Sequence, residues 1–292
     1  VGLIVYKNYA YDVKQEYINN EVNKEKLIQK IKEINTDSEL IYSNKNEAGH
    51  QNAASNIGEG IKLAVTRLGY NDRTDIEKTL ILMTDGIADR TSMEYDYKWN
   101  NDNNRGYHDH IVLGHRPNLI RTNNELDETY NALNFAKHMG KIAATRNYDK
   151  VYSIGYGLAS NNNNEALNQL NEIHSNMGGN TDSLYAVNGQ AIVNTFDNIA
   201  NNLINGLNVD NSIKNKNQEI LMVIDASEEM KECSDSYSGG HHTHSGKSCT
   251  IGIMDLEKGT CSTHEGETFP HTVANTVCHA SKLDSTKYAV LR

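Results

Sequence analysis

The sequence lacks several features that would place it in large classes of protein. It has only two prolines, no basic excess at a net charge of −10, and no apolar run of about 18 residues. The acidic balance argues against a nucleic-acid partner, because binding to a phosphate backbone needs surplus Lys and Arg. We expect no membrane span. Residues 1–20 lack the basic and apolar regions of a signal peptide, so we expect a soluble piece, already processed or excised from something longer.

The common short motifs of enzymes are also missing. The chain has no nucleophile elbow, no H-E-x-x-H, no G-x-x-x-x-G-K-[ST] and no G-x-G-x-x-G. We therefore expect a binding or structural protein in preference to an enzyme.

Apolar periodicity predicts an α/β fold. Strands are expected at 2–6, 79–83, 150–157, 184–187 and 220–224, and helices at 24–34, 55–68, 125–145, 164–175 and 189–204. Because strands and helices alternate, we expect a doubly wound, mainly parallel sheet with helices on both faces. A length of 292 residues suits one large domain or two small ones.

Two acidic residues directly follow fully apolar strands. Asp85 follows the apolar run Leu80 to Met83 after one threonine, Thr84, and Asp225 follows the run Ile220 to Ile224. Such runs are typical of strands buried on both faces of a parallel sheet, and ligands bind at the carboxyl edge of that kind of sheet. Both residues are candidate site residues, although an Asp at a strand end also serves to cap the following turn or helix.

The cysteines are confined to one Gly/Ser/His/Thr-rich segment. Two disulfides stapling an irregular insertion would give this pattern and would indicate an extracellular, cell-surface or periplasmic location. A metal cluster is the alternative, because histidines are interleaved with the cysteines, but no C-x-x-C pair supports it. The disulfide candidates are Cys233, Cys249, Cys261 and Cys278.

A long polar segment at 91–118 has little periodicity and is expected to be a surface loop. It is rich in Asn and in aromatic residues, which form a recognition surface or simply pack the loop onto its domain. The aromatic candidates are Tyr95, Tyr97, Trp99 and Tyr107.

Three segments resemble the motifs of the von Willebrand factor type A (vWA) family. ILMVIDASEEM at 220–230 resembles its first strand and the Asp-x-Ser-x-Ser metal motif. SNIGEGIKLA at 55–64 resembles the second motif, where a Thr or Ser precedes a helix, and LILMTDG at 80–86 the third. The remaining elements resemble the TadG-like vWA proteins of tight-adherence pili, a subgroup with cysteine-bearing insertions after the first motif.

The order of these segments differs from that of the family, in which the Asp-x-Ser-x-Ser strand comes first. We interpret residues 1–207 as the main part of a vWA-like domain and 208–218 as a linker. Residues 219–292 would supply the first strand, the metal motif, the Cys/His-rich insertion and the start of the first helix. A circular permutation, a window cut from a tandem array, or completion by a neighbouring chain in a filament would each explain the order.

The resemblance implies a site for Mg²⁺, or for Mn²⁺ or Ca²⁺, because hydroxyl and carboxylate oxygens are ligands for hard cations. Carried over residue by residue, the ligands are Asp225, Ser227, Ser55 and Asp85. Glu229 stands where the family has its last Ser, and it would close the site, shift its preference towards Ca²⁺, or leave it impaired. Ser55 is equally suited to cap its helix.

The expected function is metal-dependent binding of a protein partner by a surface- or pilus-associated adhesion domain. One alternative is a structural filament subunit, completed by a neighbouring copy, without a working metal site. Another, ranked lower, is a metal-dependent hydrolase that uses Asp85 and Asp225 with a histidine base.

Overall fold

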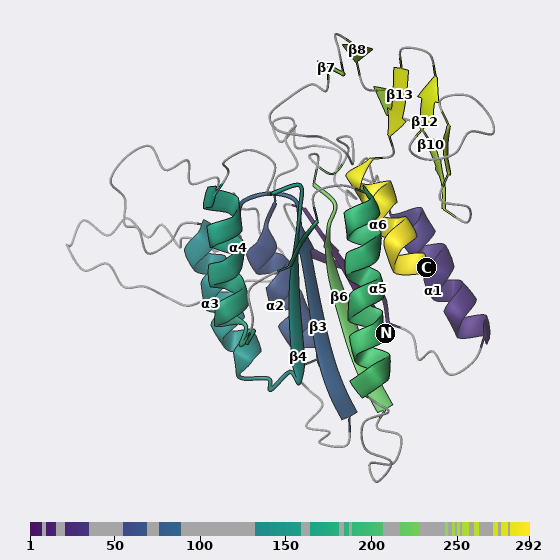
Figure 1. Cartoon of the computed structure of the whole chain (residues 1–292). Helices are drawn as coiled ribbons and strands as arrows, with labels where there is room; N and C mark the ends of the chain where they lie inside the picture. The colour runs from purple at the N-terminus through teal and green to yellow at the C-terminus, as the bar shows by residue number, and fades with distance from the viewer. Residues whose placement is uncertain are drawn as a thin grey trace, which may run out of the picture.

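The structure is a computed structural model of the whole chain (Figure 1). It describes residues 1–7, 10–15, 21–34, 55–68, 76–88, 132–158, 164–180, 184–186, 189–206, 217–227, 230, 243–244, 247–248, 250–251, 253–256, 260–262, 271–273, 276–279 and 281–292.

A six-stranded sheet forms the centre of the molecule, with the strand order β2-β1-β6-β3-β4-β5. Its strands are β1 (Gly2–Tyr6), β2 (Ala10–Gln15), β3 (Ile76–Thr84), β4 (Lys150–Tyr156), β5 (Leu184–Ala186) and β6 (Asn217–Asp225). All neighbouring pairs are parallel except β1 and β2. The last of these six strands in sequence, β6, lies between β1 and β3 in the middle of the sheet.

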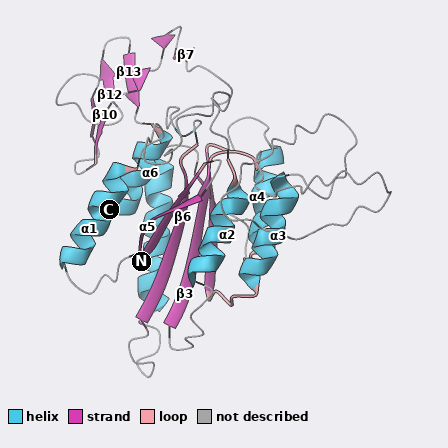
Figure 2. Cartoon of the chain, turned by 180° about the vertical axis from the view of Figure 1, so that it is seen from behind, coloured by secondary structure: helices cyan, strands magenta, loops and turns pink. Residues whose placement is uncertain are grey.

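Helices cover both faces of the sheet, as the two views show (Figures 1 and 2). One face carries α1 (Glu21–Glu33), α5 (Gly189–Gly206) and α6 (Lys282–Leu291). The other carries α2 (Ile57–Leu68), α3 (Ala132–Ala144) and α4 (Asn164–Asn176). The expected doubly wound α/β fold is confirmed.

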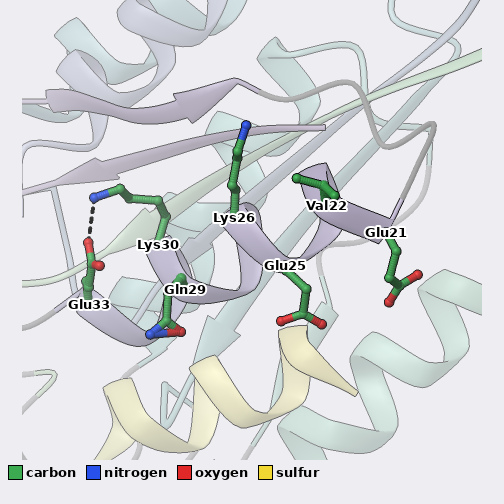
Figure 3. Close-up of a pocket in the computed structure, with 7 residues that line it drawn as sticks. All are labelled: Glu21, Val22, Glu25, Lys26, Gln29, Lys30 and Glu33. Atoms are coloured by element: carbon green, nitrogen blue, oxygen red, sulfur yellow. Dashed lines mark hydrogen bonds and ion pairs between the residues drawn. The ribbon is translucent and has the colours of Figure 1, made fainter.

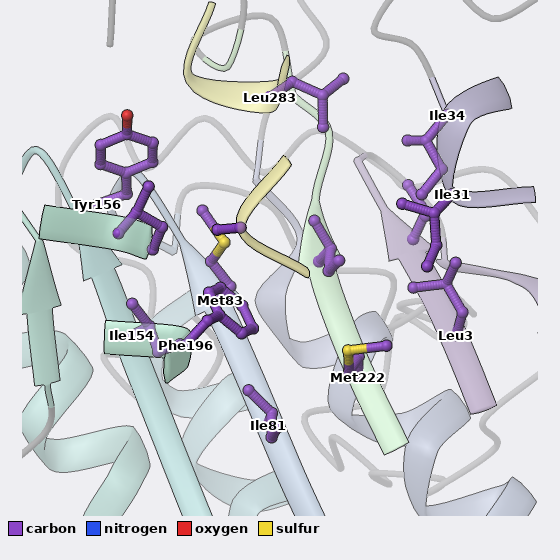
Figure 4. Packing of buried hydrophobic residues seen from close by; sticks show 14 of the residues in the cluster. Leu3, Ile31, Ile34, Ile81, Met83, Ile154, Tyr156, Phe196, Met222 and Leu283 are labelled. Carbon is purple, nitrogen blue, oxygen red and sulfur yellow. The ribbon is translucent and has the colours of Figure 1, made fainter. Parts of the chain in front are cut away.

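Successive side chains of the central strands face opposite sides of the sheet, which explains why helices pack on both faces. Met222 and Ile224 of β6 pack with α5 and α6, whereas Leu221 and Val223 pack with α2 on the opposite face. Successive side chains of a strand point to opposite faces, so an unbroken apolar run supplies two hydrophobic cores. Figure 4 shows the first core, where Leu283 of α6 lies above the carboxyl end of β6.

The Cys/His-rich segment contributes short strands to three small sheets, where a wholly irregular insertion was expected. The sheets are β12-β13-β9, β10-β11 and β7-β8. The strands are β7 (Thr243–His244), β8 (Lys247–Ser248), β9 (Thr250–Ile251), β10 (Ile253–Asp255), β11 (Thr260–Ser262), β12 (His271–Val273) and β13 (Thr276–His279). This segment connects β6 to the start of α6 (Figure 1).

Element boundaries differ modestly from the sequence expectations. Strand β6 begins at Asn217, earlier than the strand expected from 220, because polar residues at its start pair with β3. Helix α3 begins at Ala132 among the described residues, whereas the expected helix at 125–145 includes residues that the structure does not describe.

Candidate metal-binding edge of the sheet

Three segments meet at the carboxyl edge of the central strands. Asp225 is the last residue of β6, Asp85 follows β3, and Ser55 precedes α2. Two backbone hydrogen bonds fix this meeting, because Asn56 N donates to Lys7 O at 2.8 Å and Ala226 N donates to Tyr6 O at 2.9 Å. The end of β1 therefore holds both the start of α2 and the end of β6.

Asp225 accepts hydrogen bonds from all three segments. Ser55 Oγ lies 2.7 Å and Thr84 Oγ1 lies 3.1 Å from Asp225 Oδ2, while Ser227 N donates to Oδ1 at 2.8 Å. Asp225, Ser227 and Thr84 are 0% exposed, and Ser55 is 1% exposed. The carboxylate is therefore held by donors and shielded from solvent.

Ser55 does not cap its helix. The side chain of Asn56 accepts from Glu59 N at 3.2 Å and so serves as the N-cap of α2. This leaves the Ser55 hydroxyl to point at Asp225. Of the two roles open to Ser55, the contact with the candidate site is the one that the structure contains.

Burial shifts the titration of the groups around Asp225. Desolvation raises the pKa of Asp225, and the hydrogen bonds from Ser227, Ser55 and Thr84 oppose the shift by stabilising the carboxylate. Burial, together with the charge of Asp225, also raises the pKa of Tyr6, whose phenol donates to Met83 O at 3.0 Å. Negative charge at this edge is therefore electrostatically costly unless a cation balances it.

Asp85 has a cation beside it, contributed by the chain itself. Lys282 Nζ, at the start of α6, lies 3.0 Å from Asp85 Oδ2. The side chain of Lys282 is 7% exposed and that of Asp85 is 0% exposed, so this is a buried ion pair. The second carboxylate of the predicted metal site thus contacts an ammonium group.

Sequence reasoning missed three residues at this edge: Tyr6, Thr84 and Lys282. Tyr6 ends an apolar strand and Thr84 directly precedes Asp85, so their positions at strand ends were a usable signal. Lys282 has no such signal, because its contact with Asp85 joins residues far apart in the chain.

The oxygen-rich chemistry of the edge suits a hard divalent cation. Two carboxylates, Asp225 and Asp85, lie at the ends of neighbouring strands, and the hydroxyls of Ser55 and Thr84 are within hydrogen-bond distance of Asp225. Such oxygens are the ligands of Mg²⁺, which also keeps several of its waters. Within the described residues there is no group of three or more His, Cys, Asp or Glu side chains placed to hold a metal, so hydroxyls would have to complete the set.

Several predicted residues fall outside the part that the structure describes. These are Glu229, Cys233, Cys249, Tyr95, Tyr97, Trp99 and Tyr107. Cys261 lies on β11 and Cys278 on β13, where only the backbone is described. The disulfides and the aromatic recognition surface stay predictions.

An open pocket lies along α1, and none of the candidate metal ligands lines it (Figure 3). It is lined by Glu21, Val22, Glu25, Lys26, Gln29, Lys30 and Glu33. These residues all belong to one helix, and Lys30 pairs with Glu33 within it. We do not assign a site there, because a pocket lined by one face of a single helix offers no converging groups from a second element.

Comparison of the chain with protein-family models, with curated proteins and with solved structures found no match. The fold and the edge geometry therefore have to support a functional assignment on their own. Among the described residues, no helix is long and apolar enough to cross a membrane.

Proposed function

We propose that this chain is a vWA-like binding domain that engages a protein partner through a divalent cation at the carboxyl edge of its sheet. The observation that carries the proposal is the convergence of the hydroxyls of Ser55 and Thr84, from two other segments, onto the buried carboxylate of Asp225. A merely structural Asp at a strand end needs only local backbone donors.

The arrangement of the motifs supports the resemblance to vWA domains. The segments resembling the three motifs are distant in sequence, yet Ser55 and Asp225 are in contact and Asp85 follows the strand beside Asp225. Their relative order in the chain differs from the family's. Despite this difference in order, β6 pairs with both β1 and β3 and so lies in the centre of the sheet.

Asp225, Ser227, Ser55 and Asp85 would hold the cation, with Thr84 beside them. A bound Mg²⁺ supplies positive charge and a water-filled coordination position to which an acidic side chain of a partner would bind. The chain's own part is to fix the oxygens through the backbone bonds at Asn56 and Ala226 and to bury them under the surrounding elements.

A second function is favoured by the buried Lys282–Asp85 ion pair. If the ammonium permanently balances Asp85, the edge needs no metal, and the chain would act as a structural subunit of a pilus or other filament. A metal-dependent hydrolase has no observation in its favour within the described residues. The predicted disulfides would place either form outside the cytoplasm.

Calorimetric titration of the chelator-stripped protein with Mg²⁺ and with Mn²⁺ tests the proposal. We expect saturable binding by the wild type and its loss in Asp85→Asn. Asp149→Asn is the matched control, because Asp149 lies before β4 at the opposite edge, where its carboxylate accepts a backbone hydrogen bond from Lys78 N. Absence of binding in the folded wild type would refute the metal site and favour the structural subunit.

A further inference from the structure

The position of Lys282 is not explained by the helix that carries it. Lys282 is the first residue of α6, and Ser281 caps the helix by accepting from Asp284 N at 3.0 Å. The N-terminus of a helix carries partial positive charge, which disfavours a cation there. Burial of a long, strongly hydrated ammonium is also unfavourable. The ion pair with Asp85 offsets part of this cost.

The end of the Lys282 side chain extends over the carboxyl ends of β3 and β4. Besides its contact with Asp85, it lies against Gly157, directly after β4. A Cβ atom at position 157 would be 3.6 Å from Lys282 Cε and 3.9 Å from Nζ. Gly157 has a φ of 75°, a conformation that glycine adopts readily. The ammonium is therefore seated at a defined place beside the candidate metal ligands.

We propose that Lys282 competes with the divalent cation for Asp85, so that the affinity of the site for metal depends on where the start of α6 lies. This inference rests on the proposed metal-binding function and adds its regulation. A divalent cation needs the negative charge of Asp85 as well as that of Asp225. An ammonium group 3.0 Å from Asp85 neutralises one of these charges and repels an incoming cation.

The competition couples the metal site to the position of α6, because Lys282 is the first residue of that helix. Linkage is reciprocal. The release of Lys282 from Asp85 would strengthen metal binding, and metal binding would favour the release of Lys282 by the same free energy. The chain would thereby bind metal tightly only when α6 is displaced.

Three lysine variants test the competition by calorimetry with Mg²⁺ or Mn²⁺ alone. Lys282→Met removes the charge and keeps the length, and we expect it to bind metal at least tenfold more tightly than the wild type. Lys282→Arg keeps the charge and should bind like the wild type. Lys287→Met is the matched control, because Lys287 is a buried lysine of the same helix that bonds to Ile34 O and Asp284.

The outcomes separate this inference from the function on which it rests. Equal affinities in the wild type, Lys282→Met and Lys287→Met would overturn the competition and leave the metal site standing. Weaker binding by Lys282→Met would also overturn it, since Lys282 would then support the site. No binding by any folded variant would refute both.

A measurement on the wild type covers the case in which Lys282→Met fails to fold. The rate of acetylation of each lysine by acetic anhydride is followed by peptide mass spectrometry, in chelator and in saturating Mg²⁺. We expect Mg²⁺ to accelerate modification of Lys282 severalfold and to leave Lys287 unchanged. An unchanged rate at Lys282 in metal-saturated protein would overturn the competition.

Discussion

Ser55 Oγ lies 2.7 Å from Asp225 Oδ2, although 170 residues separate the two in sequence. This contact joins the start of α2 to the end of β6, and it is buried. The Ser55 hydroxyl is not needed to cap α2, because Asn56 already does so, and it is therefore available to Asp225. The same contact is what a cation site built from both segments needs, since it brings their oxygens together before any ion binds.

Ser55→Ala should destabilise the protein by about 1–3 kcal/mol, because a buried carboxylate loses a donor that it cannot replace from solvent. Urea unfolding of the metal-free protein measures this. Thr145→Ala is the control. Its exposed hydroxyl donates to Ile142 O, so its removal should change stability by no more than about 0.5 kcal/mol. Equal effects of the two substitutions would contradict the special role of Ser55.

Gly60→Ala should destabilise the protein even though alanine favours helices. A Cβ atom at position 60 would lie 2.8 Å from Tyr6 Cδ1 and 2.9 Å from Val223 Cγ1. The resulting overpacking costs about 1–3 kcal/mol, against a gain in helix propensity of about 1 kcal/mol. We also expect weaker metal binding, because a displaced α2 moves Ser55 away from Asp225.

Urea unfolding and metal titration of Gly60→Ala are compared with those of Thr66→Ala, on the exposed side of the same helix. A Gly60→Ala protein as stable as the wild type would show that α2 does not need its close approach to the sheet.

Tyr148→Phe should remove part of the loss of stability at alkaline pH. Burial raises the pKa of Tyr148, with a smaller opposing effect of Arg146, so the unfolded chain releases this proton first as pH rises through about 10. Above that pH the folded state binds more protons than the unfolded state, and its stability falls with pH. The Tyr148→Phe variant has no phenol to titrate, so it lacks this contribution to the alkaline loss of stability. In the wild type the Tyr148 hydroxyl is buried and has no hydrogen-bond partner among the described residues. Removing it should therefore lower the stability at pH 7 by no more than about 0.5 kcal/mol.

Chemical unfolding between pH 7 and 11 makes the comparison, with Tyr185→Phe as control because that ring is 55% exposed. If the stability of the wild type and of Tyr148→Phe fell equally with pH, the raised pKa of Tyr148 would not be the cause of the alkaline loss.

The sequence predicted a residue's position correctly where that position depends on a single strand or helix. Apolar runs ending in Asp85 and Asp225 predicted buried parallel strands, and the ends of such strands meet at one edge in any doubly wound sheet. Placing Ser55 there needed the family resemblance, because capping was an equally good local explanation. In the structure the side chain of Asn56 takes the capping bond and Ser55 contacts Asp225, whereas the role of Ser55 as a metal ligand stays a prediction.

Residues whose role depends on long-range packing could not be predicted. The contact of Lys282 with Asp85 requires α6 to lie on the α5 side of the sheet with its first turn at the carboxyl edge, and no periodicity in residues 282–291 specifies this. The sequence marks Tyr6 only as the last residue of an apolar strand. Its closeness to Asp225 follows from the parallel register that pairs the two residues.

The most direct test of the metal site is a crystal structure of the protein soaked with Mn²⁺, with the ion located by its anomalous scattering. The account predicts one strong peak at about 2 Å from oxygens of the set Asp225, Ser227, Ser55 and Asp85, with Lys282 moved off Asp85. A fully ordered edge without a manganese peak, in which Lys282 still pairs with Asp85, would contradict it and identify the ion pair as the permanent occupant.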